Sequence, residues 1–142
     1  MTPEQVSLVK LTFVRVIDIK EQAGRLFYDR LFEIAPETRA MFKADIDEQA
    51  RKLMDSLAVA ISVLRDGPAL AVLLDGLGKR HAAYGVRDEH YEKVGDALIW
   101  TLERGLGDAF TPAAREAWIA LYGAVASTMK KAAHGAALKA SA

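Results

Sequence analysis

Apolar residues recur every three or four positions along almost the whole chain, and this period constrains the fold more than any other feature. The stretch after Thr2 and Pro3 shows it clearly, with apolar side chains at Val6, Val9 and Phe13. Such spacing places these side chains on one face of an α-helix. Neither the alternating pattern of a strand nor the Asn-Gly signal of a hairpin occurs. The sequence therefore predicts an all-α fold of six to seven helices.

Proline and glycine mark the ends of the expected helices. Thr2-Pro3 is typical of an N-cap followed by the first helical residue, and Gln5 is placed to complete a capping box. The same kind of signal gives the remaining boundaries. We expect helices from Thr2, from Ile19 to Ile34 with a stop at Pro36, from Asp47 to Asp66, from Leu70 to Gly85, from Asp88 to Gly105 and Gly107, and from Thr111 to a tail frayed after about residue 133.

The composition fits one folded domain, residues 1–142, and excludes several function classes. The 19 basic and 19 acidic residues cancel, so no net field attracts nucleic acid or an anionic membrane. The absence of cysteine removes disulfides, thiolate metal sites and cysteine nucleophiles. No apolar stretch is long enough to span a bilayer, and the N-terminus has no secretory pattern. We expect a cytoplasmic protein, monomeric or weakly dimeric, with no nucleic-acid partner and no membrane span.

The three histidines, His81, His90 and His134, are the remaining candidates for metal chemistry. No two of them have the spacing of a helical zinc site, and neither a nucleophile elbow nor a phosphate-binding loop occurs. His81 stands at the end of a leucine-rich helical face, one turn after Leu77 and one turn before Gly85. By spacing alone, a lone helical histidine is more often a packed or solvent-edge residue than a ligand.

Several segments together resemble the globin family, specifically bacterial single-domain globins and the haem domain of flavohaemoglobins. The segment KRHAAYGV, followed by HY and VG, is the most specific of them. The resemblance covers nearly the whole chain and is carried by LFYDRLF at 26–32, the interval from Pro36 to Phe42, DEQARKLM at 47–54, LGKRHAAYGVRDEHYEKVGDAL at 77–98 and AWIALYG at 117–123. It implies a globin fold packed around a haem pocket.

On the proximal side, the resemblance implies that His81 is the metal ligand of a haem b group. The second ring nitrogen of His81 would donate to the carbonyl of Leu77, which fixes the tautomer. Phe42 would pack flat against the porphyrin, while Lys52 and Arg80 would supply cations for the propionates. The other expected haem contacts are Leu53, Leu57, Leu77, Val86, Tyr91 and Val94.

On the distal side, the matching residues are Tyr28, Gln49 and Leu53. The hydroxyl of Tyr28 and the amide of Gln49 would each donate to bound dioxygen, a bond worth about 1–3 kcal/mol in a desolvated pocket. Leu53 would restrict the space for the gas. The alternative is that Tyr28 bonds a nearby carbonyl and Gln49 turns to solvent. Because Gln49 is not a histidine, a second imidazole ligand is not expected there, although weak capture by Lys52, Gln49 or Tyr28 stays open.

The resemblance also gives the expected function, reversible binding of dioxygen and other diatomic ligands. Flavohaemoglobins add a tyrosine and a glutamate that polarise the proximal histidine; Tyr91 matches the tyrosine, but Ala133 stands where the glutamate belongs. Strong oxygen activation is therefore doubtful, unless His134 substitutes. Nitric oxide dioxygenation would need a separate reductase, because no flavin module is present in the sequence. Gas sensing through a partner is the third hypothesis.

Overall fold

The computed structural model describes residues 1–43 and 45–141, with side chains through residue 135. Over these residues the chain is all-α, as predicted from the helical period. It forms α1 (Pro3–Asp18), α2 (Lys20–Ile34), the 3-10 helix η1 (Pro36–Met41), α3 (Ile46–Ser62), α4 (Gly67–Ala83), α5 (Asp88–Leu106), the 3-10 helix η2 (Gly107–Ala109) and α6 (Pro112–Ser141). Within the described ranges, no helix has the length and hydropathy needed to cross a membrane.

Local signals explain several of the helix boundaries. In α1 the predicted capping box is present, since the Gln5 amide donates to Thr2 Oγ1 at 3.1 Å and the Thr2 amide donates to Gln5 Oε1 at 3.0 Å. Gly85 has φ +90° directly after α4, a conformation that costs other residues energy. Gly105, in contrast, was expected to break α5 but lies inside it. The turn comes at Gly107, which has φ +53°.

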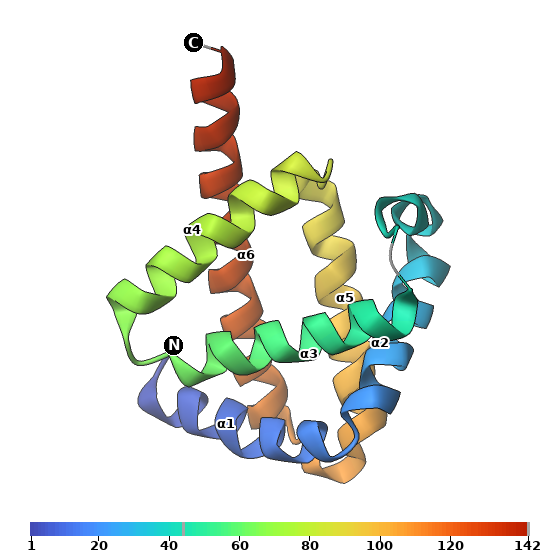
Figure 1. The fold of residues 1–142 in the computed structure, drawn as a ribbon. Coiled ribbons are helices and arrows are strands. Elements are labelled where there is room, and N and C mark those ends of the chain that lie inside the picture. The colour runs from blue at the N-terminus through green and yellow to red at the C-terminus, as the bar shows by residue number, and fades with distance from the viewer. Residues whose placement is uncertain (44, 142) are drawn as a thin grey trace.

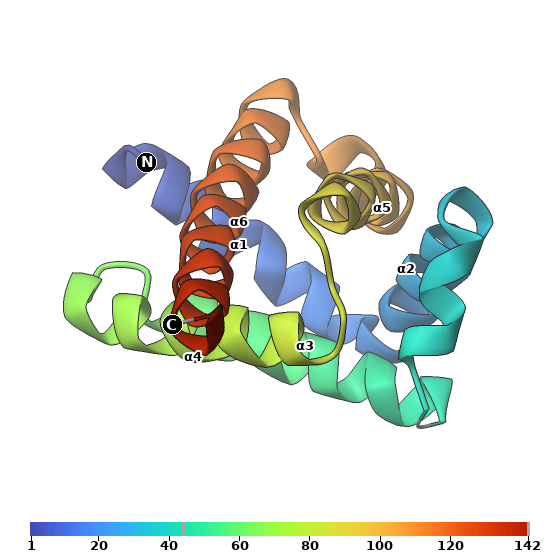
Figure 2. The ribbon, with the colours of Figure 1, turned by 90° about the horizontal axis from the view of Figure 1, so that it is seen from above.

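The helices cross one another rather than run as a parallel bundle. Helix α6 packs across α4 and α1, whereas α2 packs against α5 and α3 (Figure 1). Seen from above, α3 and α4 lie along one side, and α5 with much of α6 lies along the other (Figure 2). In Figure 1, α3, α4 and α5 lie around the centre of the view.

Two glycines allow the closest helix crossings. A Cβ on Gly78 would lie 2.4 Å from the carbonyl oxygen of Met129, so α4 and α6 meet with backbone against backbone. A Cβ on Gly24 would lie 2.6 Å from the Cβ of Ala50, so the backbone of α2 meets the small side chain of Ala50 on α3. Because any side chain at these positions would push the helices apart, the two glycines fix the depth of the crossings.

The tightest core lies where α1, α2, α5 and α6 meet. Val9, Leu31 and Trp118 are at most 1% exposed there. The indole Nε1 of Trp118 donates to Thr12 Oγ1 at 2.8 Å, so its polar atom is satisfied. Helix α6 continues from this core through Ser141. The fraying expected after residue 133 stays a prediction, and the side chains from residue 136 onward lie outside the described part.

Candidate functional site

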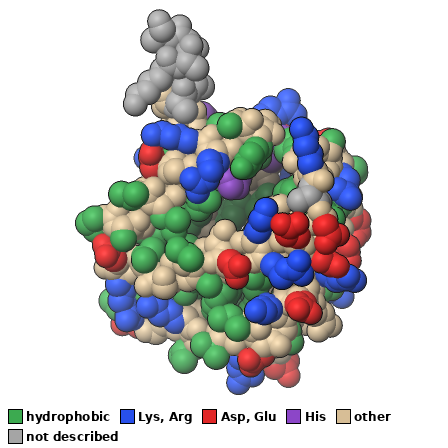
Figure 3. Space-filling model, in the orientation of Figure 1, with side chains coloured by type: hydrophobic (Ala, Val, Ile, Leu, Met, Phe, Trp, Pro, Cys, Tyr) green, Lys and Arg blue, Asp and Glu red, His purple; other side chains and the backbone are tan. Residues whose placement is uncertain are grey.

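Apolar side chains line a hollow on the face of the molecule that Figure 3 presents, and a histidine lies at its edge. Figure 3 has the orientation of Figure 1, in which this part of the face lies among α3, α4 and α5. The predicted apolar contacts are only partly buried although they pack against the core, namely Phe42, Leu53, Leu57, Leu77, Val86 and Val94. Phe42, Leu53, Leu57 and Val94 pack against one apolar cluster and Leu77 and Val86 against a second, and each keeps part of its surface uncovered.

His81 projects from the last turn and a half of α4 and is held by its own helix. Its Nδ1 lies 2.7 Å from the carbonyl oxygen of Leu77, one turn earlier. Because a carbonyl only accepts, Nδ1 carries the proton and Nε2 keeps a lone pair. Burial lowers the pKa of the imidazole, and the nearby Arg80 lowers it further, against the opposing effect of the Leu77 bond. A neutral imidazole with a free Nε2 is the form that binds a transition metal.

Tyr28 lies on α2 inside a cluster of four aromatic rings. Its ring centroid is 5.0 Å from that of Phe27, 5.2 Å from that of Phe42 and 5.8 Å from that of Phe32. Only 3% of Tyr28 is exposed. Burial raises the pKa of the Tyr28 phenol to about 12, partly offset by the nearby Gln49 side chain, which lowers it. The hydroxyl therefore stays protonated and remains a donor at neutral pH.

The crossing of α2 and α3 brings the two predicted distal donors together. Gly24 contacts Ala50, so Tyr28, one turn after Gly24, lies beside Gln49, the neighbour of Ala50. Gln49 is partly buried, and Leu53 follows one turn later on the same helix. The structure thus unites the polar and apolar residues that the sequence placed on the distal side.

The expected cations at the rim are exposed and are not fixed by buried partners. Lys52 lies 3.9 Å from Glu48 on the surface of α3. The guanidinium of Arg80 folds back along α4, where its Nη1 lies 3.2 Å from the position of a Cβ on Gly76. Both side chains have the reach that a propionate contact needs. Their role in holding propionates stays a prediction.

The proximal side of α5 carries an unusual polar group. Tyr91 is 6% exposed, and its hydroxyl has no hydrogen-bond partner in the described part of the chain. Tyr122 donates instead to the backbone carbonyl of Tyr91. His134 is directed elsewhere, because its Nε2 lies 3.1 Å from both carboxylate oxygens of Asp88 at the surface. His134 therefore does not replace the carboxylate that is missing at Ala133.

Sequence reasoning missed two features of the site. Phe32 belongs to the aromatic cluster around Tyr28, and its spacing of four residues from Tyr28 was the available signal. Arg25 on α2 forms two hydrogen bonds to Asp47 on α3, which no local pattern predicts because 22 residues separate them. No group of three or more His, Asp or Glu side chains suited to a metal ion occurs in the parts that the structure describes.

Comparisons with known proteins agree with this geometry. The family model described as "Globin" matches residues 25–129. The neuroglobin of Chaenocephalus aceratus is 32% identical over 122 residues, which cover 76% of this chain and 77% of that protein. The neuroglobin of Dissostichus mawsoni gives the same identity and coverage, and that of Danio rerio is 30% identical with the same coverage.

Proposed function

This chain belongs to the globin family, and on that premise we propose that it binds haem b through His81 and takes up dioxygen beside Tyr28 and Gln49. The observation that carries the proposal is the bond from His81 Nδ1 to the Leu77 carbonyl, which leaves Nε2 free to act as a metal ligand. When bound, haem supplies an iron atom with a vacant position for a diatomic gas.

The uncovered apolar surface of the hollow fits a flat, largely apolar group. Leu53 and Leu57 on α3, Leu77 on α4 and Val94 on α5 are all partly buried, and we expect these four to line it. Covering such surface gains about 25 cal/mol per Å². A porphyrin held by His81 would therefore be retained by apolar burial as well as by the imidazole.

The residues on the other side of the space favour a polar diatomic ligand. Tyr28 keeps its phenolic proton because its pKa is raised to about 12, and Gln49 lies beside it. Each would donate one hydrogen bond to dioxygen, which slows its release by about one to two decades. Carbon monoxide, which is less polar, would gain less from the same two donors.

We further propose that the chain is functionally closest to bacterial single-domain globins and the haem domain of flavohaemoglobins. The pairing of Tyr28 with Gln49 supports this placement. The relatives named above are neuroglobins, so the subgroup assignment rests on the distal residues and not on overall identity.

Optical spectra of the haem-reconstituted protein test the proposal directly. We expect a Soret band that shifts on reduction and again on exposure to carbon monoxide, together with reversible spectral changes in dioxygen. Absence of a Soret band after addition of one equivalent of haem would reject haem binding. A spectrum that does not respond to carbon monoxide would reject gas binding.

Nitric oxide dioxygenation is the second candidate, favoured by the paired donors at Tyr28 and Gln49. Conversion of dioxygen and nitric oxide to nitrate would leave the haem oxidised by one electron. A separate reductase would have to supply that electron. The unpartnered hydroxyl of Tyr91 and the alanine at position 133 disfavour strong oxygen activation. Sustained NADH consumption with added reductase would indicate the enzyme; one stoichiometric reaction would indicate storage or scavenging.

A gas sensor would require a partner whose affinity changes with ligation.

A further inference from the structure

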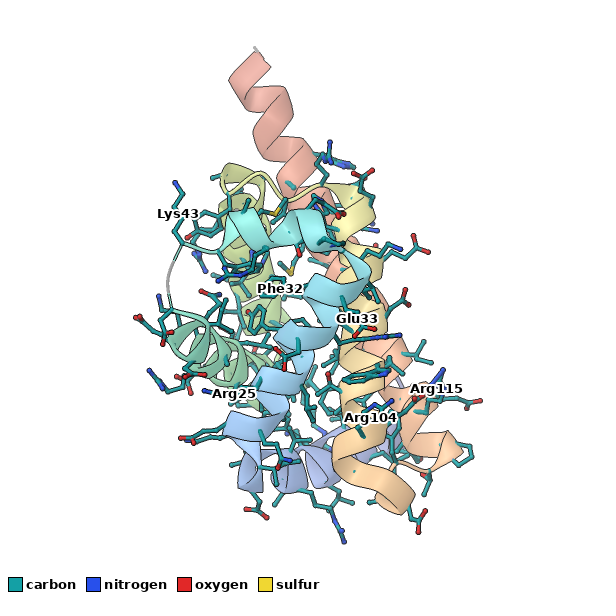
Figure 4. The ribbon with its side chains drawn as sticks, turned by 90° about the vertical axis from the view of Figure 1, so that its right-hand side faces the viewer. Arg25, Phe32, Glu33, Lys43, Arg104 and Arg115 are labelled. Carbon is teal, nitrogen blue, oxygen red and sulfur yellow. The ribbon has the colours of Figure 1, made fainter. Side chains whose placement is uncertain are left out.

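A bidentate ion pair ties α2 to the first turn of α3. The guanidinium Nε of Arg25 lies 2.8 Å from Asp47 Oδ1, and its Nη2 lies 2.8 Å from Asp47 Oδ2. This fork-to-fork geometry is the strongest form of a surface ion pair, because each of the two nitrogens donates to its own carboxylate oxygen. Figure 4 shows Arg25 on the side of α2 that is next to α3. The pair also lowers the pKa of Asp47 through its hydrogen bond to Arg25.

The first turn of α3 has few other attachments. Asp45 stands at its N-cap position, yet its side chain makes no capping hydrogen bond. The amides of the first turn therefore lack the usual side-chain acceptor. Among the residues with described side chains, no other ion pair joins α2 to α3.

Gln49 lies between this ion pair and the fixed crossing point. Asp47 is two residues before it, and Ala50, which meets Gly24, follows it. The backbone that carries Gln49 is thus held to α2 on both sides. Loss of the Arg25 contact would leave the apolar contacts of Ile46 with the core and the crossing at Ala50, and the turn with Gln49 could shift away from Tyr28.

We propose that Arg25 and Asp47 are positioning residues that hold Gln49 beside the Tyr28 hydroxyl and thereby slow release of the bound gas. This inference rests on the proposed function, because it assumes that Tyr28 and Gln49 face the gas. It assigns a ligand-binding role to a pair that touches neither haem nor gas. The pair acts through the backbone of α3, since both of its side chains are substantially exposed.

The exposure of the pair determines what its loss would change. Exposed ion pairs contribute little to global stability, so the melting temperature should hardly move. The mobility of the Gln49 side chain is a different quantity, because it depends on how the first turn of α3 is attached to α2. We expect dioxygen release to accelerate about threefold to tenfold without the pair, which is less than the loss of a direct donor. High salt should also accelerate dioxygen release from the wild type, because salt screens the exposed ion pair.

The experiment compares Arg25→Gln, Asp47→Asn and the charge-reversed double variant Arg25→Asp/Asp47→Arg with the wild type. Stopped-flow measurement gives the dioxygen release rate of each haem-loaded protein. Both single variants should release dioxygen faster, and the double variant should recover much of the wild-type rate. Arg115→Gln serves as the matched control, because it removes another exposed ion pair between helices, Arg115 to Glu103 at 2.7 Å. Its release rate should equal that of the wild type.

A second readout uses the protein without haem. Hydrogen–deuterium exchange of the amides at 49–52, which begin the intrahelical hydrogen bonds of α3, should be faster in Arg25→Gln than in the wild type, while exchange in α4 and α6 should be unchanged. Equal exchange at 49–52 in both proteins would overturn the positioning role even if haem binding failed. Conversely, a wild type that binds no haem rejects the proposed function, whatever exchange shows. Unchanged release rates in loaded single variants would also overturn the inference.

Discussion

The core around Trp118 and the hollow beside His81 are built from similar side chains, but these side chains are buried to different extents. Around Trp118, apolar residues are nearly fully buried, and the single indole N–H meets Thr12 Oγ1. Around His81, the apolar residues Leu77 and Val86 stay partly exposed, and Nε2 of the imidazole keeps a lone pair. The first region is complete within the protein itself. The second leaves apolar surface and a lone pair that a bound group would cover.

The two regions should therefore contribute separately to stability and to ligand binding. Residues of the complete core should matter for folding with or without a ligand. Residues of the hollow should contribute little to the unfolding free energy of the haem-free protein and much to that of the haem-loaded protein. Their contacts form mainly with the bound haem. Substitutions in each region measure one side of this contrast against the other.

The largest expected effect is a loss of stability in the complete core. Leu31→Ala removes a side chain that is 1% exposed and should cost about 2–5 kcal/mol of unfolding free energy, through lost burial and the cavity it leaves. Leu57→Ala, its counterpart in the hollow, should cost the haem-free protein about 1 kcal/mol or less, because Leu57 is only partly buried.

Urea unfolding of both haem-free variants, followed by circular dichroism, measures the two costs. If Leu57→Ala destabilises the empty protein as much as Leu31→Ala, the hollow is as tightly packed as the core. The contrast between the two regions would then be wrong.

Replacement of the proximal histidine should abolish tight haem retention and leave the fold intact. Since changes to residues around a metal ligand already cost about 10–100-fold in affinity, His81→Ala should weaken haem binding by more than about 100-fold. Transfer of haem to an acceptor apoprotein, followed by absorbance, measures the loss. Added imidazole should partly restore the Soret band, and His134→Ala, at a surface histidine, should bind haem as the wild type does. Retention of haem by His81→Ala would show that another residue is the ligand.

Removal of the phenolic donor should change gas release more than stability. Tyr28→Phe keeps the ring contacts with Phe27 and Phe42 and deletes only the hydroxyl. Dioxygen release should accelerate by about one to two decades, the value of one hydrogen bond in a desolvated site. Stopped-flow kinetics measure this rate. An unchanged rate would transfer the role of donor from Tyr28 to Gln49.

The fold was largely predictable because its signals are local. The capping box of Thr2 with Gln5, the stop at Pro36 and the positive φ at Gly85 all involve residues a few positions apart. The error at Gly105 has the same origin, since glycine is tolerated inside a helix and only the conformation at Gly107 ends α5. The bond from His81 to Leu77 was likewise expected, because the two residues are one helical turn apart.

The features that were missed or left open depend on long-range packing. The contact of Arg25 with Asp47 arises only because Gly24 and Ala50 allow α2 and α3 to cross closely. Periodicity states which face of a helix is apolar, but it does not state which helix will cover that face. His134 was left open as a partner for the proximal side for the same reason, and the fold pairs it with Asp88.

The dioxygen release rate should not change with pH around neutrality. Burial raises the folded-state pKa of Tyr28 to about 12, above its ordinary value of 10.0. A group whose pKa is raised in this way keeps its proton, and the associated stability, below the unfolded value and loses them only as pH rises through the folded value. The dioxygen release rate should therefore stay flat between about pH 7 and about pH 10. Tyr28→Phe should be equally flat, at a faster rate. A rise in the wild-type rate with a midpoint near about pH 10 would mean that water reaches the phenol as it does in an unfolded chain, and that the distal side is more open than its aromatic cluster indicates.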